Sequence, residues 1–161
     1  MRKALLLIAL AALAVTWIVT VQAIYGAHPL PARIATHFDA AGNANGWGEP
    51  RMLWLFPIIS TFIVGLMTLV GRHPQAFNYP VRVTPATRPR FEAISLSMIA
   101  WLRAELVCLF LGIQYVIIRS ARDGRNSLSP WLLPLVILVV FATIGRHFVA
   151  MIRIGRAGVR N

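Results

Sequence analysis

The side chains in this sequence that could do chemistry fall into two groups, and the first lies in a polar loop. It contains His28, His37, Asp39 and Glu49. Imidazole and carboxylate groups bind zinc when three or four of them converge, but no HxxxH or HExxH spacing enforces convergence here. We therefore expect no metal: His37 should hydrogen-bond the loop backbone and Asp39 should cap a turn. A pH-sensitive latch at His37 is the open alternative, because imidazole titrates near neutral pH.

The second group lies inside long apolar segments and consists of Arg103, Glu105, Arg146 and His147. Charges near the middle of a membrane are costly, so such side chains should face the protein interior or water and find partners. Arg103 and Glu105 are two positions apart, or about 200° around a helix, and cannot share one face. Glu105 should therefore pair with Arg146 on a neighbouring helix. A polar pathway or ligand pocket is the alternative to this structural ion pair.

Motifs of common enzyme classes are missing from the sequence. It contains no Gly-x-Ser-x-Gly elbow, no phosphate-binding glycine-rich loop before a lysine and no paired carboxylates. We therefore expect no catalytic residue and no cofactor.

Ser60, Ser95 and Ser97 are interpreted as small residues that let helices approach in a membrane. Cys108 is the single cysteine, which excludes an intrachain disulfide, and we expect a buried thiol.

The elements that must position these residues are apolar helices. Of the 161 residues, 58% are hydrophobic and only 13% are charged, which is unlike a soluble domain. Four segments, at residues 4–25, 52–71, 93–118 and 131–152, reach the length of about 20 residues that crosses a bilayer as a helix. The sequence therefore predicts an all-α integral membrane protein. Residues 1–161 should form one membrane domain, an antiparallel bundle of about four transmembrane helices.

The first apolar segment has two interpretations. Arg2 and Lys3 precede an apolar run, and residues 21–23 resemble the cleavage site of a secretory signal peptide. The run is longer than the usual signal core of about 7–15 residues. We therefore favour a retained anchor over cleavage after residue 23.

The charge distribution predicts partners and orientation. A net charge of +11 would suggest nucleic-acid binding in a soluble protein. Here the arginines gather at the ends of apolar segments, where they meet anionic headgroups, so we expect membrane lipid and no nucleic acid as a partner. Placing the N-terminus in the cytoplasm puts nine Lys and Arg on that side and five on the other. This excess predicts a multi-pass protein of the plasma (inner) membrane with both termini cytoplasmic. The nine are Arg2, Lys3, Arg72, Arg82, Arg88, Arg90, Arg153, Arg156 and Arg160, and the five are Arg33, Arg51, Arg119, Arg122 and Arg125.

Two loops differ in character. In the outer loop, 26–50, Gly42 and Gly46 are expected to adopt positive φ. The apolar side chains of this loop should pack it onto the helix ends or the membrane interface. They are Ile34, Phe38 and Trp47. The inner loop, 72–91, contains four prolines that disfavour a helix, and its residues 79–83 alternate like a short strand.

The outer loop carries the most specific pattern, Leu-Pro-x-x-Ile-x-x-His-Phe-x-x-x-Gly-x-x-x-Gly-Trp-Gly over residues 30–48. It resembles the hallmark of a bacterial membrane domain of unknown function that also opens the SdpI-type toxin-immunity proteins. The Asn-Tyr-Pro-Val segment at 78–81 is similar to a second family segment. This chain is shorter than the six-span immunity proteins. The motif residues, and hence candidate ligand contacts, are His37, Phe38, Asp39, Gly42, Gly46, Trp47 and Gly48.

Two classes of function follow. The favoured one is a non-enzymatic protein of the bacterial inner membrane that recognises a peptide, lipid or protein partner. The resemblance implies immunity or signalling. The alternative is a membrane-embedded enzyme or transporter that uses His37, Asp39 and Glu49, or the inner group from Arg103 to His147.

Overall fold

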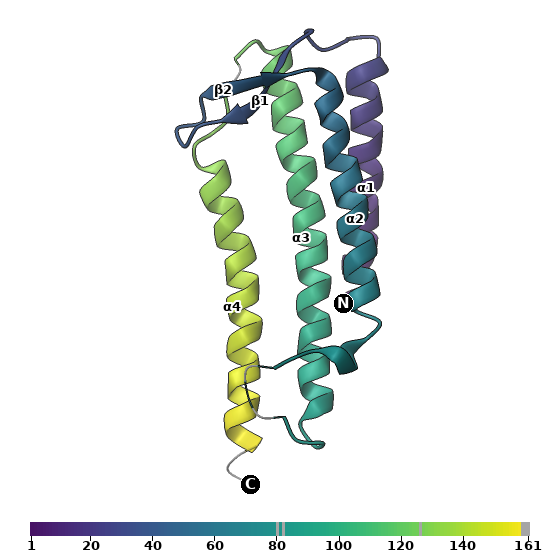
Figure 1. The fold of residues 1–161 in the computed structure, drawn as a ribbon, viewed down its shortest axis with the longest axis vertical. Helices are drawn as coiled ribbons and strands as arrows, with labels where there is room; N and C mark the ends of the chain where they lie inside the picture. The colour runs from purple at the N-terminus through teal and green to yellow at the C-terminus, as the bar shows by residue number, and fades with distance from the viewer. Residues whose placement is uncertain (80, 82, 126, 159–161) are drawn as a thin grey trace.

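The computed structural model describes residues 1–79, 81, 83–125 and 127–158 (Figure 1). Four helical segments in it are long and apolar enough to cross a membrane, which confirms the predicted fold class. They are α1 (Arg2–Tyr25), α2 (Leu55–Val70) with the preceding 3-10 helix η1 (Pro50–Trp54), α3 (Arg88–Arg122) and α4 (Leu132–Gly158).

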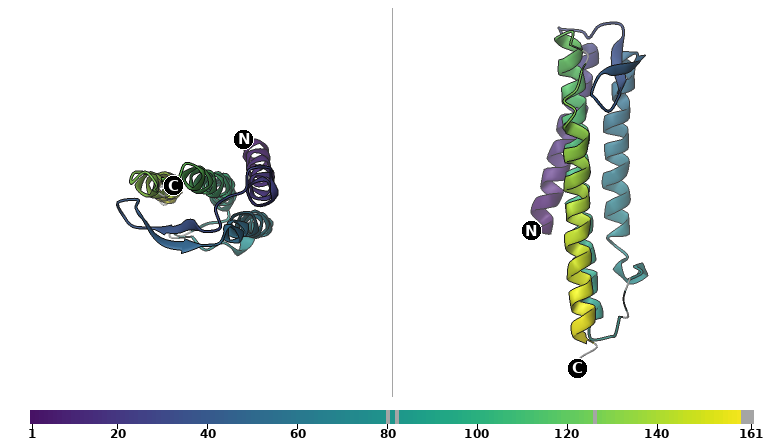
Figure 2. Two further views of the ribbon diagram at one scale, coloured as in Figure 1. Left: turned by 90° about the horizontal axis from the view of Figure 1, so that it is seen from above. Right: turned by 90° about the vertical axis from the view of Figure 1, so that its left-hand side faces the viewer.

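The helices alternate in direction, and α3 lies in the middle (Figures 1 and 2). Helices α1 and α2 pack on one side of α3, and α4 packs on the other. Both ends of the described chain therefore lie away from the loop that joins α1 to α2 (Figure 1).

That loop forms an antiparallel hairpin of two strands, β1 (Ile34–Phe38) and β2 (Ala44–Gly48). The strands were not predicted, because turn residues dominate the segment and only a few positions alternate in polarity. An isolated bridge between Asn43 and Ser127 connects the hairpin to the α3–α4 connection. Figure 1 shows the hairpin lying across the ends of the helices.

The core beneath the hairpin explains why the loop is held in place. Ile34 is fully buried with Leu53 and Ile117, and Phe38 packs at the edge of this cluster. Burying a side chain of this size stabilises by about 1.5–3 kcal/mol. Trp47 does not join them, because 45% of its surface is exposed. The expected packing therefore holds for Ile34 and Phe38, and Trp47 lies on the outer side of the hairpin.

Helices α1 and α3 meet along a seam of small and polar residues. Thr16 and Thr20 are fully buried and donate their hydroxyls to carbonyls four residues earlier in α1. Across the seam, Gln114 Nε2 donates to Thr20 Oγ1 at 2.5 Å. Such packing is typical of membrane helices, where small residues allow close approach and buried polar groups pair with each other. α1 is thus an integral part of the bundle, while its retention as an anchor stays a prediction.

Helix α3 is longer than a membrane crossing requires. Its 35 residues span about 52 Å, whereas hydrocarbon is about 30 Å thick. Leu5 and Ala9 of α1 pack against Ala100 and Ala104, so the start of α1 lies level with the middle of α3. Figure 2 shows α3 and α4 continuing well beyond the start of α1 and the end of α2.

The projecting part of α3 packs against the proline-rich inner loop. This loop contains a short 3-10 helix, η2 (Pro74–Ala76). Phe91 is fully buried and contacts Tyr79, with ring centroids 5.2 Å apart and ring planes tilted by 51°. Residues 79, 81 and 83 form no strand, and residues 80 and 82 of the expected strand lie outside the described chain.

The prediction of a buried thiol at Cys108 is wrong, since its side chain is exposed on the surface of α3.

Candidate functional site

The hairpin fixes its polar side chains by local hydrogen bonds. His37 Nδ1 is hydrogen-bonded to the Asn45 side-chain oxygen across the two strands. The sequence predicts that His37 bonds the loop backbone. In the structure it pairs instead with a side chain of the opposite strand.

Asp39 caps the turn between the strands, as predicted. Its Oδ1 accepts hydrogen bonds from the backbone N–H groups of Asn43 at 2.8 Å and Ala41 at 2.9 Å. The hydrogen bond from the Asn43 backbone is the main reason that the pKa of the Asp39 carboxyl is held below its usual value of 3.8. The carboxylate therefore stays charged in the folded turn at neutral pH.

At two glycines of the motif, Gly42 and Gly46, a side chain would collide with a neighbouring element, and the neighbour differs. Gly42 has the predicted positive φ, 85°, and a Cβ there would lie 2.0 Å from the backbone oxygen of Leu128. The prediction of positive φ at Gly46 is wrong. Gly46 is instead pressed against the opposite strand, because a Cβ there would lie 2.8 Å from that of His37. Strand proximity cannot be inferred from the loop composition alone.

The loop side chains considered as metal ligands do not come together. His28, His37 and Glu49 are exposed, and Asp39 is occupied by its turn. Within the described residues, no group of three or more histidine, cysteine, aspartate or glutamate side chains is placed to hold a metal ion.

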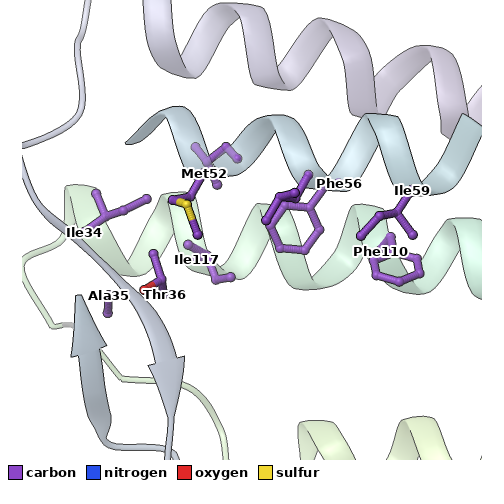
Figure 3. A pocket seen from close by; sticks show the side chains of 10 residues that line it. Ile34, Ala35, Thr36, Met52, Phe56, Ile59, Phe110 and Ile117 are labelled. Carbon is purple, nitrogen blue, oxygen red and sulfur yellow. The ribbon is translucent and has the colours of Figure 1, made fainter. Parts of the chain in front are cut away.

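Two hollows lie beneath the hairpin. One of about 240 Å³ lies between η1, α2 and α3, and Figure 3 shows Met52, Phe56 and Phe110 around it. The other, of about 370 Å³, lies between the hairpin, α3 and the start of α4. Thr36, Phe56 and Ile117 line both, so the two are neighbours. The walls are mainly apolar, and His37 and Asp39 lie at the polar margin of the larger hollow.

The inner group of candidate residues is split among separate faces. Glu105 Oε1 accepts a hydrogen bond of 2.6 Å from Thr143 Oγ1 on α4. Among the described residues no ion pair joins Glu105 to Arg146, so the predicted pairing is wrong. The guanidinium of Arg146 instead lies 5.2 Å from the centre of the Trp101 ring, an arrangement that favours a cation–π interaction.

His147 continues the polar contacts between α3 and α4. It is 6% exposed, and its Nδ1 lies 2.8 Å from the Thr143 backbone oxygen. Its Nε2 lies 3.3 Å from Ser97 Oγ. A chain of polar groups thus runs from Ser97 through His147 and Thr143 to Glu105. Sequence reasoning missed the role of Thr143, which looked like an ordinary small residue in an apolar run.

Arg103 points away from this chain, as its spacing from Glu105 predicts. Its Nη1 donates to Thr68 Oγ1 on α2 at 3.1 Å. Arg103 lies near the level at which α1 begins, where it lines one small hollow together with Arg2 and Gly71.

The fold and these sites define a small four-helix membrane protein with a hairpin over one end of the bundle. Residues 4–61, which include most of α1, the hairpin and the first turns of α2, are similar to the family described as "Domain of unknown function (DUF1648)". An "Uncharacterized protein" of Archaeoglobus fulgidus is 26% identical over 154 residues, covering 87% of this chain and 81% of the relative. No solved structure matches the chain.

Proposed function

We propose that this protein is a non-enzymatic membrane protein that recognises the apolar part of a peptide, lipid or protein partner beneath its hairpin. The observation that carries the proposal is the pair of neighbouring hollows under the hairpin, of about 240 and 370 Å³. Binding sites for small ligands are commonly apolar hollows with a few polar groups at defined positions. His37 and Asp39 supply such groups at the margin.

Immunity or signalling at the membrane is the role that the resemblance to SdpI-type proteins implies. The hairpin lies within residues 4–61, the part of the chain that is similar to the domain of unknown function. A partner that approaches from the hairpin side of the membrane would meet the polar margin first. Its apolar part would then enter the hollow between α2, α3 and α4.

Substitutions that fill the larger hollow test this function. The full chain in lipid nanodiscs would be titrated with a fluorescent fatty acid and, separately, with a labelled apolar helical peptide. Ile113→Trp fills the hollow and should weaken binding of whichever probe binds the unmodified chain by about tenfold. Loss of apolar contact with about two CH₂ groups corresponds to a change of that factor. Leu138→Trp is the matched control, because Leu138 is 65% exposed on α4. Equal binding by both variants, or binding of neither probe to the unmodified chain, would contradict the proposal.

A second candidate function is transport by the inner polar residues. The observation that favours it is the chain from Ser97 through His147 and Thr143 to Glu105, whose Oε2 is buried without a hydrogen-bond partner among the described residues. Buried ionisable groups of this kind are common in proton pathways. Liposomes containing a pH-sensitive dye would measure proton flux. Glu105→Gln should abolish the flux, whereas Arg146→Gln, outside the chain of contacts, should not.

A further inference from the structure

Three arginine side chains line one hollow of about 150 Å³ at the level where α1 begins, on the far side of the bundle from the hairpin. Arg2 comes from the start of α1, Arg72 from the residues after α2, and Arg103 from α3. Figure 2 shows the start of α1 and the end of α2 at the same height along the bundle. The free amide groups of the first turn of α1 add partial positive charge at this end.

The lining contains no acidic residue. It is completed by Met67, Thr68, Gly71, Leu96, Ile99 and Ala100. The chain has only five aspartates and glutamates in total, and all five are described. In the described structure, no carboxylate lies within ion-pair distance of these three arginines. The described side chains therefore supply no negative charge to this hollow.

Arg103 is the buried member of the three arginines. The residue is 8% exposed, and among the described groups its Nε has no hydrogen-bond partner. Among the described groups, the side chain makes one hydrogen bond, from Nη1 to Thr68 Oγ1. Burying a guanidinium without a counter-charge is costly, and a side chain that can donate five hydrogen bonds is suited to an oxyanion. Arg2 and Arg72, by contrast, are exposed at the mouth of the hollow.

The size and depth of the hollow fit a phosphate group. A water molecule needs only about 10–15 Å³ of such space, so about 150 Å³ holds several waters or one tetrahedral oxyanion. The hollow lies where α1 begins and α2 ends, which is the level expected for headgroups if these helices cross the membrane. Arginine is the preferred residue for phosphate because its planar fork can bind two oxygens together.

We propose that Arg2, Arg72 and Arg103 form a binding site for a phosphate-bearing anion, with Arg103 as its buried contact. A phospholipid headgroup and free phosphate share this chemistry. The former would hold its acyl chains against α2 and α3, and the latter would enter from the aqueous side.

Native mass spectrometry of the full chain, delipidated in detergent, tests the site and separates the two sources. The probes are phosphatidylglycerol, diacylglycerol with the same acyl chains, and inorganic phosphate. The chain should bind phosphatidylglycerol more tightly than diacylglycerol. Arg103→Gln should weaken that binding by about tenfold or more, as expected for loss of a charge-assisted hydrogen bond. Arg153→Gln, an exposed arginine on α4 at the same end of the molecule, is the matched control and should change nothing.

Each outcome decides the proposal. Preference for phosphatidylglycerol with no response to inorganic phosphate identifies a lipid headgroup as the ligand. Binding of inorganic phosphate with the same dependence on Arg103 identifies a free anion. Equal binding of phosphatidylglycerol and diacylglycerol, or unchanged binding in Arg103→Gln, overturns the site. If Arg103→Gln does not fold, the double variant Arg2→Gln, Arg72→Gln decides, because both side chains are exposed.

Discussion

Thr143 of α4 donates a hydrogen bond of 2.6 Å from its Oγ1 to Oε1 of Glu105 on α3. This single contact replaces the ion pair with Arg146 that the charges alone suggested. Arg146 gains its favourable environment from the Trp101 ring instead. The two helices are thus joined by a hydroxyl and a carboxyl group, and the arginine is independent of both.

Thr143→Val should destabilise the bundle by about 1–3 kcal/mol, because it removes the donor and leaves a buried acceptor unsatisfied. Glu105→Gln should cost less, since the amide oxygen can still accept from Thr143. Thermal unfolding of the purified chain in detergent would measure both. Thr143→Ser is the control that keeps the hydroxyl. Equal stability of the Val and Ser variants would show that the contact contributes nothing.

Gly42→Ala should disrupt the hairpin more than Gly124→Ala does. Both glycines have positive φ, 85° and 68°, so both substitutions carry the same kind of backbone strain. Only at Gly42 would the new Cβ also collide with a backbone atom, the oxygen of Leu128 at 2.0 Å. At Gly124 a Cβ would meet nothing within 4 Å.

Limited proteolysis of the hairpin would compare these two glycine variants. Gly124→Ala should remain close to the unmodified chain, because strain of this kind costs about 1 kcal/mol. Gly42→Ala should be cleaved much faster within the hairpin. Identical cleavage rates would mean that the contact between the hairpin turn and Leu128 does not hold the loop.

The Asp39 carboxyl should titrate below 3.8, chiefly because the Asn43 backbone donates a hydrogen bond to its charged form. Since the folded pKa is lower than the unfolded one, this cap stabilises the turn fully above the unfolded value. The stabilisation is lost as the pH falls through the folded pKa. Amide proton shifts of Ala41 and Asn43 followed by NMR should therefore change with a midpoint below 3.8. Asp39→Asn should remove the transition, and a midpoint at or above 3.8 would contradict the cap.

The sequence predicted the helices well because hydropathy and length are sufficient to recognise a membrane span. It also predicted the turn at Asp39 and the positive φ of Gly42, which depend on local chemistry. The sequence did not predict features that depend on the distance between separate elements of the fold. The closeness of Gly46 to His37 depends on how two strands align.

The partners of Glu105 and Arg146 also depend on how α3 and α4 align. Because opposite charges attract, the sequence predicts an ion pair between Glu105 and Arg146. In the bundle Thr143 of α4 faces Glu105 instead, and its hydroxyl donates a hydrogen bond to one of the two carboxyl oxygens, Oε1. The separation of Arg103 and Glu105 onto two faces was predictable, because helix geometry alone determines it.

The orientation of the bundle can be tested with single cysteines in a Cys108→Ser chain. Ala40, in the hairpin turn, and Gln75, in the inner loop, are both exposed and lie on opposite sides of the four apolar spans. The excess of Lys and Arg on the side of the inner loop predicts that this side is cytoplasmic. In intact cells a membrane-impermeant maleimide should therefore label Ala40→Cys, while Gln75→Cys should react only after permeabilisation. Labelling of Gln75→Cys alone in intact cells would invert the orientation, and the arginine hollow would then face the outer leaflet.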